Sequence, residues 1–290
     1  MTLRRRGIDW LLNAYAGLAL VYLLVPIAVI VVFSFNNPIG RFNFIWQDFS
    51  LDAWKHPFAV QGVGDALKTS LEIAALSTVG ATILGTLTAL ALVRYEFKGR
   101  APVNFFIFIP LATPEVVLGA ALLSQFLNLG TPQLGFATIL IAHIMFNLSF
   151  VVITVRSRLI GFDRSLEEAA QDLGATPWET FRLVTLPLIM PGVISAALLA
   201  FALSIDDFVI TNFNSGSTIT FPLFIWGAAR VAIPPQIYVI ATMIFLFTVA
   251  VMILTVWQQR RAEKMAAVRP DDAEPPLGPP EPAFAQRAAA

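Results

Sequence analysis

The sequence of 290 residues contains no cysteine and only two histidines. The absence of cysteine excludes thiol catalysis, disulfide bonds and cysteine-ligated metals, and it leaves the redox compartment undetermined. His143 lies alone in an apolar run, so we expect a packed or hydrogen-bonded helix residue rather than a metal ligand. The sequence also lacks G-x-x-x-x-G-K-[ST], H-E-x-x-H and G-x-S-x-G, which excludes a P-loop and these catalytic motifs.

Charge is scarce as well. Charged residues make up 13% of the chain and hydrophobic residues 57%, and the mean hydropathy is +0.73. A soluble domain has about 45–50% apolar and about 25% charged residues. The 19 basic and 19 acidic residues give a formal net charge of zero, and they cluster at the ends of apolar runs. The composition therefore predicts a membrane protein, and no nucleic-acid partner is expected.

Apolar runs of about 20 residues, the length that crosses a bilayer, predict an all-α polytopic protein with six spans. The third span is the least regular, because Pro110 and Pro114 interrupt it. The first is interpreted as a retained anchor, because it exceeds the apolar core of about 7–15 residues in a signal peptide. The six predicted spans cover about residues 10–33, 66–93, 102–127, 134–155, 189–213 and 237–257.

The distribution of Lys and Arg predicts the orientation of these spans. Fifteen of the 19 basic residues fall at the termini or between spans two and three and spans four and five. Cytoplasmic loops carry such an excess, so both termini and the 156–188 loop are expected in the cytoplasm. The predicted organisation is a basic N-terminus (1–9), a transmembrane domain (10–258) and a Pro-rich, disordered cytoplasmic tail (259–290).

The 156–188 loop carries two helix-start signals in series. Ser165 and Glu168 have the spacing of a capping box, and Gly174 stands where a helix favours a left-handed C-terminal residue. Thr176 begins a second capping signal, followed by Pro at the first helical position. The pattern predicts a helix, a glycine turn and a second short helix that stops at Pro187. Capping alone is also typical of a plain helical hairpin that joins two spans.

The spacing of Glu168-Ala169-Ala170, Gly174 and Val184-x-Leu186-Pro187 resembles the EAA loop of ATP-binding-cassette importer permeases. Val184 stands where the family usually has Ile, which keeps the β-branched apolar character. The resemblance implies a type I importer permease fold in which this loop docks on an ATPase subunit. It assigns the coupling role to Glu168, Ala169, Ala170, Gly174, Leu186 and Pro187.

Two aromatic residues in the same loop suit such a docking role. Trp178 and Phe181 are spaced i, i+3, so they share one face of a helix. Large aromatic side chains dominate the binding energy of many interfaces. We therefore expect Trp178 and Phe181 to anchor the loop in a cleft of the ATPase.

The resemblance extends over about residues 8–258 and narrows to the second permease subunit of spermidine/putrescine importers. It is carried by Pro110…Pro114-Glu115-Val116-Val117, Leu203-Ser204-Ile205-Asp206-Asp207-Phe208-Val209-Ile210, Phe221-Pro222-Leu223 and Pro234-Pro235. It implies half of a translocation pathway in a bacterial plasma membrane. The implied partners are an ATPase dimer that holds ATP and Mg²⁺, a second permease subunit and an extracytoplasmic substrate-binding protein, and this chain would bind no cofactor and catalyse no reaction.

Three acids stand at predicted membrane depth: Glu115, Asp206 and Asp207. An acidic side chain there costs about 2.5–3.5 kcal/mol, and their own spans contain no basic residue. They are candidates for a pathway that attracts a cation, although two adjacent acids on a helix cannot both face it squarely. The alternative for the Asp pair is to cap a helix break or to pair with a partner subunit, and the alternative for Glu115 is to satisfy a broken-helix end.

Other function classes stay open at this point. A related importer permease for another cation, an amino acid, an opine-like compound or iron could carry similar residues. A secondary transporter would show interrupted spans in symmetric positions and needs no coupling loop. An intramembrane enzyme would need a catalytic constellation, and a non-catalytic membrane assembly factor is the remaining alternative.

Overall fold

A computed structural model describes residues 2–130, 133–161 and 163–267. This part of the chain is helical apart from its connecting segments and two isolated β-bridges, which confirms the predicted all-α class. The helices are α1 (Thr2–Phe33), α2 (Asp52–Lys55), α3 (Val63–Arg94), α4 (Arg100–Ala112), α5 (Glu115–Asn128), α6 (Phe136–Ile160), α7 (Ser165–Asp172), α8 (Pro177–Thr180), the π-helix η1 (Phe181–Thr185), α9 (Leu186–Ile205), α10 (Val209–Asn214), α11 (Phe221–Val231) and α12 (Pro235–Ala267).

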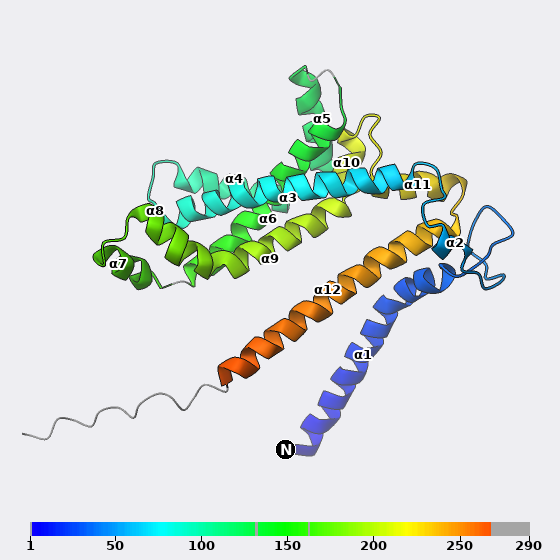
Figure 1. The fold of residues 1–290 in the computed structure, drawn as a ribbon, viewed down its shortest axis with the longest axis horizontal. Coiled ribbons are helices and arrows are strands. Elements are labelled where there is room, and N and C mark those ends of the chain that lie inside the picture. The colour runs from blue at the N-terminus through cyan, green and yellow to red at the C-terminus, as the bar shows by residue number, and fades with distance from the viewer. Residues whose placement is uncertain (1, 131–132, 162, 268–290) are drawn as a thin grey trace, which may run out of the picture. The chain divides into compact units, whose positions relative to one another are not determined.

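The chain divides into two compact units. The first contains residues 1–37, 46–55 and 235–290, and the second contains residues 38–45 and 56–234. In the first unit α1 and α12 pack on each other and α2 packs on α12 (Figure 1). Phe35 stacks on Trp54, with ring centroids 5.2 Å apart, and on Phe49 at 5.8 Å. These stacked rings fix the segment that follows α1.

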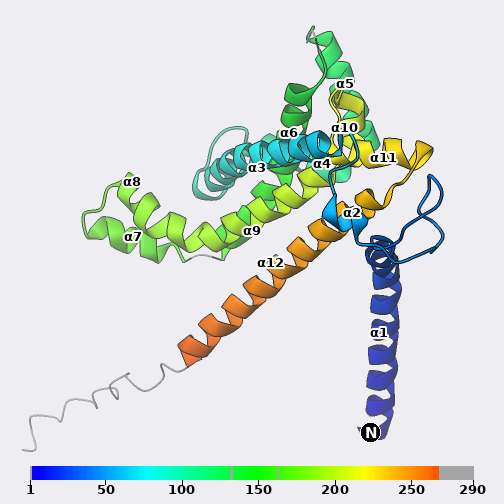
Figure 2. The ribbon, with the colours of Figure 1, turned by 45° about the vertical axis from the view of Figure 1, so that its right-hand side comes forward.

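The second unit is built on three long helices, α3, α6 and α9, each of which packs on the other two (Figures 1 and 2). Most side chains of their contact surface are alanines or β-branched, and small residues allow close approach of membrane helices. Its fully or almost fully buried members are Ala81, Ala89, Leu92, Val151, Val152, Val155, Leu159, Ile189, Ala196 and Ala200. This bundle carries the candidate site residues at both of its ends.

Gly85 shows how closely α3 and α6 approach. A Cβ atom built on Gly85 would lie 2.6 Å from Cγ1 of Val151. Such a contact is too short for any real side chain, so a substitution would push the two helices apart. Interfaces between membrane helices are enriched in small residues for this reason.

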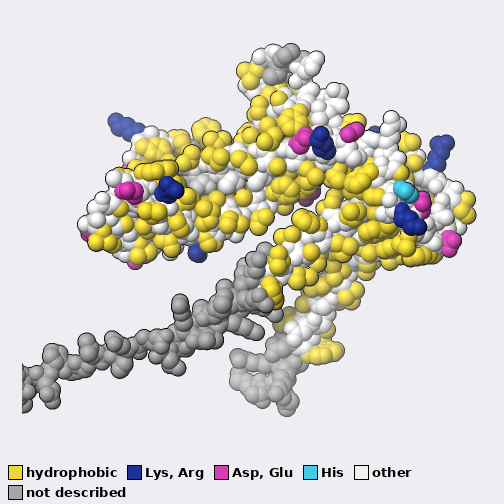
Figure 3. Space-filling view, in the orientation of Figure 1, with side chains coloured by type: hydrophobic (Ala, Val, Ile, Leu, Met, Phe, Trp, Pro, Cys, Tyr) yellow, Lys and Arg dark blue, Asp and Glu magenta, His cyan; other side chains and the backbone are white. Residues whose placement is uncertain are grey.

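The outer surface agrees with a membrane environment. In Figure 3 apolar side chains cover most of the visible face, and charged side chains form small, separate groups. Among the described residues, four helices are long and apolar enough to span a bilayer: Trp10–Phe33, Val63–Arg94, Phe136–Ile160 and Pro177–Ile205. They correspond to the predicted first, second, fourth and fifth spans.

The predicted third and fifth spans are not single straight helices. α4 and α5 meet at an angle of 114°, with Thr113 and Pro114 between them. Pro114 cannot donate the backbone hydrogen bond that a continuous helix needs, and it disfavours the helical conformation of the residue before it. The fifth predicted span, 189–213, is broken after Ile205, and α10 follows as a separate short helix.

The predicted sixth span lies in α12. The apolar part of α12 with described side chains, Pro235–Val251, is shorter than a full span. The predicted span reaches residue 257 and so includes side chains outside the described ones. The number of six membrane spans therefore stays a prediction. The predicted disordered tail, 259–290, begins inside α12, which continues to Ala267. Good helix formers from Gln258 to Ala267 explain this continuation, and residues 268–290 lie outside the described part.

Candidate functional site

The 156–188 loop folds into the predicted order of helix, glycine turn and helix. α7 ends at Asp172, Gly174 follows with a φ of +91°, and α8 begins at Pro177. Nothing lies within 4 Å of a Cβ atom built on Gly174. The positive φ, and not a lack of space, is therefore what favours glycine at this turn.

The first of the two capping predictions is wrong and the second is confirmed. Ser165 is the first residue of α7, and its backbone N–H donates to Oδ1 of Asp163 at 3.0 Å. Arg164, and not Ser165, occupies the N-cap position of α7, so the predicted capping box does not form; the bond from the Ser165 N–H lowers the pKa of Asp163. At α8 the Thr176 backbone N–H donates to Oε2 of Glu179 at 2.8 Å, and the Glu179 N–H donates to Oγ1 of Thr176 at 3.3 Å.

Pro187 does not end the second helix. The helix runs without interruption from Pro177 to Ile205, and Phe181–Thr185, near its N-terminal end, form a π-helical turn. In this turn the Leu186 backbone N–H donates to the carbonyl of Phe181, five residues earlier. The wider turn accommodates a proline next to it, because the usual hydrogen bond from residue 187 is not required. Leu186 and Pro187 thus begin α9 rather than terminate a loop helix.

Trp178 and Phe181 lie side by side on α8 and η1. Their ring centroids are 5.6 Å apart, and Trp178 is 65% exposed. The structure confirms that the two rings share a face. A large exposed aromatic side chain outside the helical bundle is available to a partner.

Glu167, which precedes Glu168, holds the loop to the bundle. Its Oε1 accepts from Nη2 of Arg94 at 2.9 Å and from the hydroxyl of Thr185 at 2.6 Å. The side chains of Arg94 and Glu167 are 14% and 13% exposed. This nearly buried ion pair joins the end of α3 to α7 and η1, beside a cavity of about 270 Å³. Glu168 instead pairs with Arg164 at 3.5 Å on the surface.

At the other end of the bundle, Asp207 caps the break between α9 and α10. Its Oδ2 accepts from the backbone N–H and the hydroxyl of Thr211, both at 2.8 Å, and its Oδ1 accepts from the N–H of Ile210 at 3.3 Å. These bonds satisfy donors at the start of a short helix. The capping alternative that the sequence left open for the Asp pair is what the structure shows for Asp207.

Asp207 also has a hydrogen-bonding partner from another helix. Nε2 of His143 on α6 lies 3.2 Å from Oδ2 of Asp207 and 2.9 Å from Oγ1 of Thr211. The side chains of His143 and Asp207 are 3% and 6% exposed. The sequence shows no basic residue within the span of Asp207, and the structure places its partner on α6 instead. The expectation that His143 is a hydrogen-bonded helix residue is confirmed.

The contacts of His143 continue into a chain of hydroxyl groups. Nδ1 lies 2.7 Å from Oγ of Ser204 on α9, and Ser204 lies 2.9 Å from Oγ of Ser77 on α3. Thr211 donates to Asp207, so its oxygen is free to accept from Nε2, and Nε2 therefore carries a proton. The network ties α3, α6, α9 and α10 together through buried polar groups.

Asp206 and Glu115 differ from Asp207 in their exposure. The structure leaves both side chains exposed, and neither has an ion pair within the described residues. Glu115 is the first residue of α5, directly after the break. α5 packs against α10, where a Cβ atom built on Gly119 would lie 2.8 Å from Cδ2 of Phe213. The contact between α5 and α10 therefore joins the break before α5 to the break after α9.

Sequence reasoning missed Arg94, Glu167, Ser77, Ser204, Thr211 and Asn147. Two local patterns could have indicated some of these residues. One is the pair of adjacent acids Glu167 and Glu168, and the other is the i, i+4 spacing of Asp207 and Thr211. Ser77 and Arg94 gave no signal, because their partners are 127 and 73 residues away. Asn147 is fully buried on α6, one turn after His143, and its amide has no hydrogen-bond partner among the residues that the structure describes.

Comparison with known proteins places this geometry in a family. Residues 81–264 match the family model described as the inner membrane component of binding-protein-dependent transport systems. The chain is 37% identical over 247 residues to the spermidine/putrescine transport system permease protein PotC of Haemophilus influenzae, covering 85% of this chain and 95% of that protein. It is 39% identical over 255 residues to the putrescine transport system permease protein PotI of Escherichia coli K12, covering 85% and 90%.

Solved structures agree at the level of the fold. A bacterial ABC transporter involved in the import of alginate aligns with a TM-score of 0.65 and 18% identity, over 89% of this chain and 98% of that chain. An amino acid ABC transporter aligns with a TM-score of 0.54 and 19% identity, over 69% and 93%. The resemblance seen in the EAA-like loop is therefore confirmed over most of the sequence. The chain belongs to the family of inner membrane components of binding-protein-dependent transport systems.

Proposed function

We propose that this chain is a permease subunit of an ATP-driven importer and forms half of the translocation pathway for a polyamine such as spermidine or putrescine. The observation that carries the substrate class is the identity of 37–39%, over 80–85% of the chain, to relatives named as spermidine/putrescine and putrescine permeases. Chain length, apolar helices and the 156–188 loop all suit this role.

In this proposal the 156–188 loop couples the chain to a separate ATPase. Trp178 and Phe181 enter a cleft of the ATPase, and Gly174 sets the direction of their helix. Glu168, Ala169 and Ala170 on α7 complete the docking surface, and Leu186 and Pro187 pass its movement into α9. The ion pair of Arg94 and Glu167 supports this by tying the loop to α3.

In this proposal Asp206, Glu115 and Asp207 have different roles. Asp206 is exposed, so it can accept hydrogen bonds from a substrate ammonium group, which are stronger than bonds between neutral groups. Glu115, also exposed, is the second candidate. Asp207 is already engaged by His143 and Thr211, so we assign it the positioning of the break that carries Asp206.

The remaining parts of the machine lie on other chains. We propose an ATPase dimer that binds ATP and Mg²⁺, a second permease subunit and an extracytoplasmic protein that delivers the substrate. The chain would lie in the bacterial plasma membrane with both termini in the cytoplasm, in accord with the distribution of Lys and Arg. It would itself catalyse no reaction.

Uptake in cells that lack their own polyamine import tests the proposal. Cells with this chain and its co-encoded partner subunits should accumulate labelled spermidine or putrescine, and cells without this chain should not. Unlabelled polyamine should compete, and an amino acid or ferric iron should not. Competition by one of these other solutes, with no effect of polyamine, would indicate an importer of a different substrate class.

A further inference from the structure

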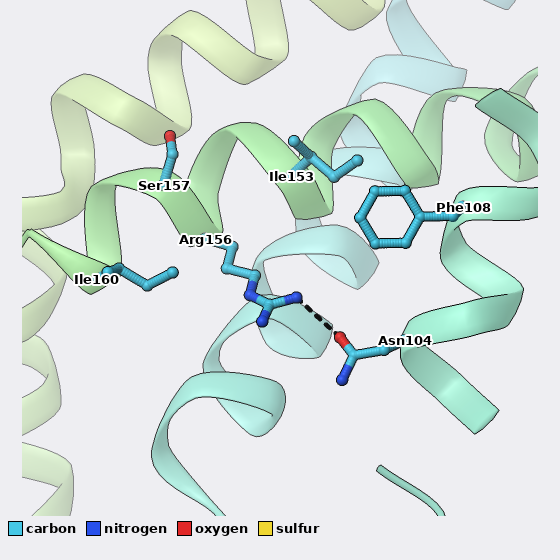
Figure 4. Close-up of a pocket in the computed structure, with 6 residues that line it drawn as sticks. All are labelled: Asn104, Phe108, Ile153, Arg156, Ser157 and Ile160. Carbon is cyan, nitrogen blue, oxygen red and sulfur yellow. Dashed lines mark hydrogen bonds between the residues drawn. The ribbon is translucent and has the colours of Figure 1, made fainter. Parts of the chain in front are cut away.

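A cavity of about 500 Å³ opens between α4 and α6, away from both sites described above. Its lining is mainly apolar, from Phe108 on α4 and Ile153 and Ile160 on α6. Arg156 enters it from α6, and Figure 4 shows its guanidinium group directed at Asn104 of α4. The site therefore combines one cation with a wall suited to a hydrocarbon chain.

The guanidinium group is held in place but is not neutralised. Nη1 of Arg156 donates to Oδ1 of Asn104 at 2.8 Å, and Nδ2 of Asn104 donates to the carbonyl of Arg100 at 3.0 Å. The bond to the Arg100 carbonyl holds the Asn104 amide in one orientation, and this amide in turn holds the Arg156 guanidinium group in place. No carboxylate lies within ion-pair distance of Arg156 in the described chain. Arginine has five N–H donors, and most of them stay available to an anion.

The position of the cavity along the helices indicates the kind of anion. Arg156 and Ile160 belong to the last two turns of α6, and Asn104 belongs to the first turns of α4, which begins at Arg100. Arg94 and Lys98 precede α4 at this same basic end. Cytoplasmic headgroups carry negative charge, and basic pockets between membrane helices on that side bind anionic headgroups.

We propose that this cavity binds an anionic phospholipid, with its phosphate on Arg156 and part of an acyl chain against Phe108, Ile153 and Ile160. Guanidinium and phosphate match in geometry and charge, and the bond is strong in a partly buried site. A polyamine is excluded as the occupant, because Arg156 would repel its ammonium groups. The neighbouring Phe105 and Phe106 are 67% and 66% exposed, as side chains that face hydrocarbon would be.

Native mass spectrometry of the delipidated complex, assembled with its partner subunits, tests the site. The probes are phosphatidylglycerol and phosphatidylethanolamine with identical acyl chains. Wild type should retain phosphatidylglycerol in preference, and Arg156→Gln should reduce its retention about fivefold, the effect of about one basic residue at a membrane surface. Arg158→Gln is the matched control, because Arg158 is exposed on the same helix and does not line the cavity; it should retain the wild-type preference.

Two further variants keep the test decisive if Arg156→Gln fails to assemble. Arg156→Lys keeps the charge and should preserve part of the preference, whereas Asn104→Leu frees the guanidinium and should weaken it. Equal retention of the two lipids by wild type, or an equal loss in both glutamine variants, would overturn the proposal. Displacement of the lipid by millimolar inorganic phosphate would indicate a site for free phosphate. Loss of the second permease subunit from every Arg156 variant would indicate a carboxylate of that subunit instead.

Discussion

Nε2 of His143 lies 3.2 Å from Oδ2 of Asp207, so a buried hydrogen bond joins α6 to the break after α9. The pair divides the two adjacent acids between two tasks. Asp207 is used by the protein itself, and Asp206 stays exposed at the same break. In the proposed function, Asp206 is therefore the acid of the pair that is available to a substrate.

The first prediction separates the two acids. Asp206→Asn should lower polyamine uptake and leave the melting temperature of the complex close to that of wild type, because the exposed side chain makes no ion pair within the described residues. Asp207→Asn should lower the melting temperature, since it weakens several hydrogen bonds to a charged acceptor worth about 1.5–3 kcal/mol each. Uptake and thermal unfolding are measured on the same preparations. Wild-type uptake by both variants would show that the acids are structural only.

The second prediction concerns the coupling of His143 to Asp207. His143→Gln, Asp207→Asn and the double variant should form a cycle in which the double variant loses less stability than the sum of the single variants. Residues in direct contact show interaction energies of about 0.5–3 kcal/mol. The cycle is read from chemical or thermal unfolding in detergent. Additive losses would mean that the pair contributes no energy of its own.

The third prediction distinguishes the two neighbouring glutamates of the loop. Glu167→Gln should lower the unfolding temperature, because it leaves the nearly buried guanidinium of Arg94 without its charge partner. Glu168→Gln removes only a surface pair, worth about 0.2–1 kcal/mol. It should therefore weaken co-purification with the ATPase without a measurable loss of fold. If the two variants exchanged these effects, the roles assigned to the residues would be reversed.

The fourth prediction concerns the turn between α7 and α8. Gly174→Val should abolish uptake while the protein still inserts in the membrane, because a β-branched residue resists a φ of +91°. Gly161→Ala offers a control in the same loop, since Gly161 has a φ of −80° and an added Cβ meets only ordinary contacts. Uptake and membrane content are measured together. Normal uptake with Gly174→Val would exclude a coupling role for the turn.

The fifth prediction uses the unpaired amide of Asn147. A buried polar group without a partner costs about 1–3 kcal/mol, so Asn147→Leu should raise the unfolding temperature or leave it unchanged. Ser204→Ala, on α9, should lower it, because Ser204 links His143 to Ser77. A clear loss of stability with Asn147→Leu would indicate that water or a partner chain satisfies this amide.

Local signals in the sequence were sufficient to predict the all-α membrane class and the order of helix, turn and helix in the 156–188 loop. Long apolar runs determine where helices cross a bilayer, and the spacing of Gly174, Thr176 and Pro177 determines a turn and a helix start. These features depend on residues close together in the chain. The same local rules gave the wrong end at Pro187, because a π-helical turn in front of the proline removes its usual effect.

The pairing of charged and polar side chains could not be predicted from residues close together in the chain. Arg94 meets Glu167 across 73 residues, and His143 meets Asp207 across 64. Which acid of an adjacent pair turns inward depends on the backbone of the break after α9 and on where α6 places His143. Sequence periodicity indicates that a helix is buried, but it does not specify the residue that each buried side chain meets.

ATP hydrolysis in proteoliposomes tests the central claim, that this chain couples a polyamine pathway to an ATPase through its 156–188 loop. The chain, its partner subunits and the binding protein are reconstituted, and hydrolysis is measured with and without spermidine or putrescine. We expect polyamine to stimulate hydrolysis in wild type and in the surface variant Arg158→Gln. Trp178→Ala should lose the stimulation, because the exposed ring no longer anchors the loop. The account would be contradicted if polyamine did not change the rate of ATP hydrolysis in wild type, or if polyamine stimulated hydrolysis fully in Trp178→Ala.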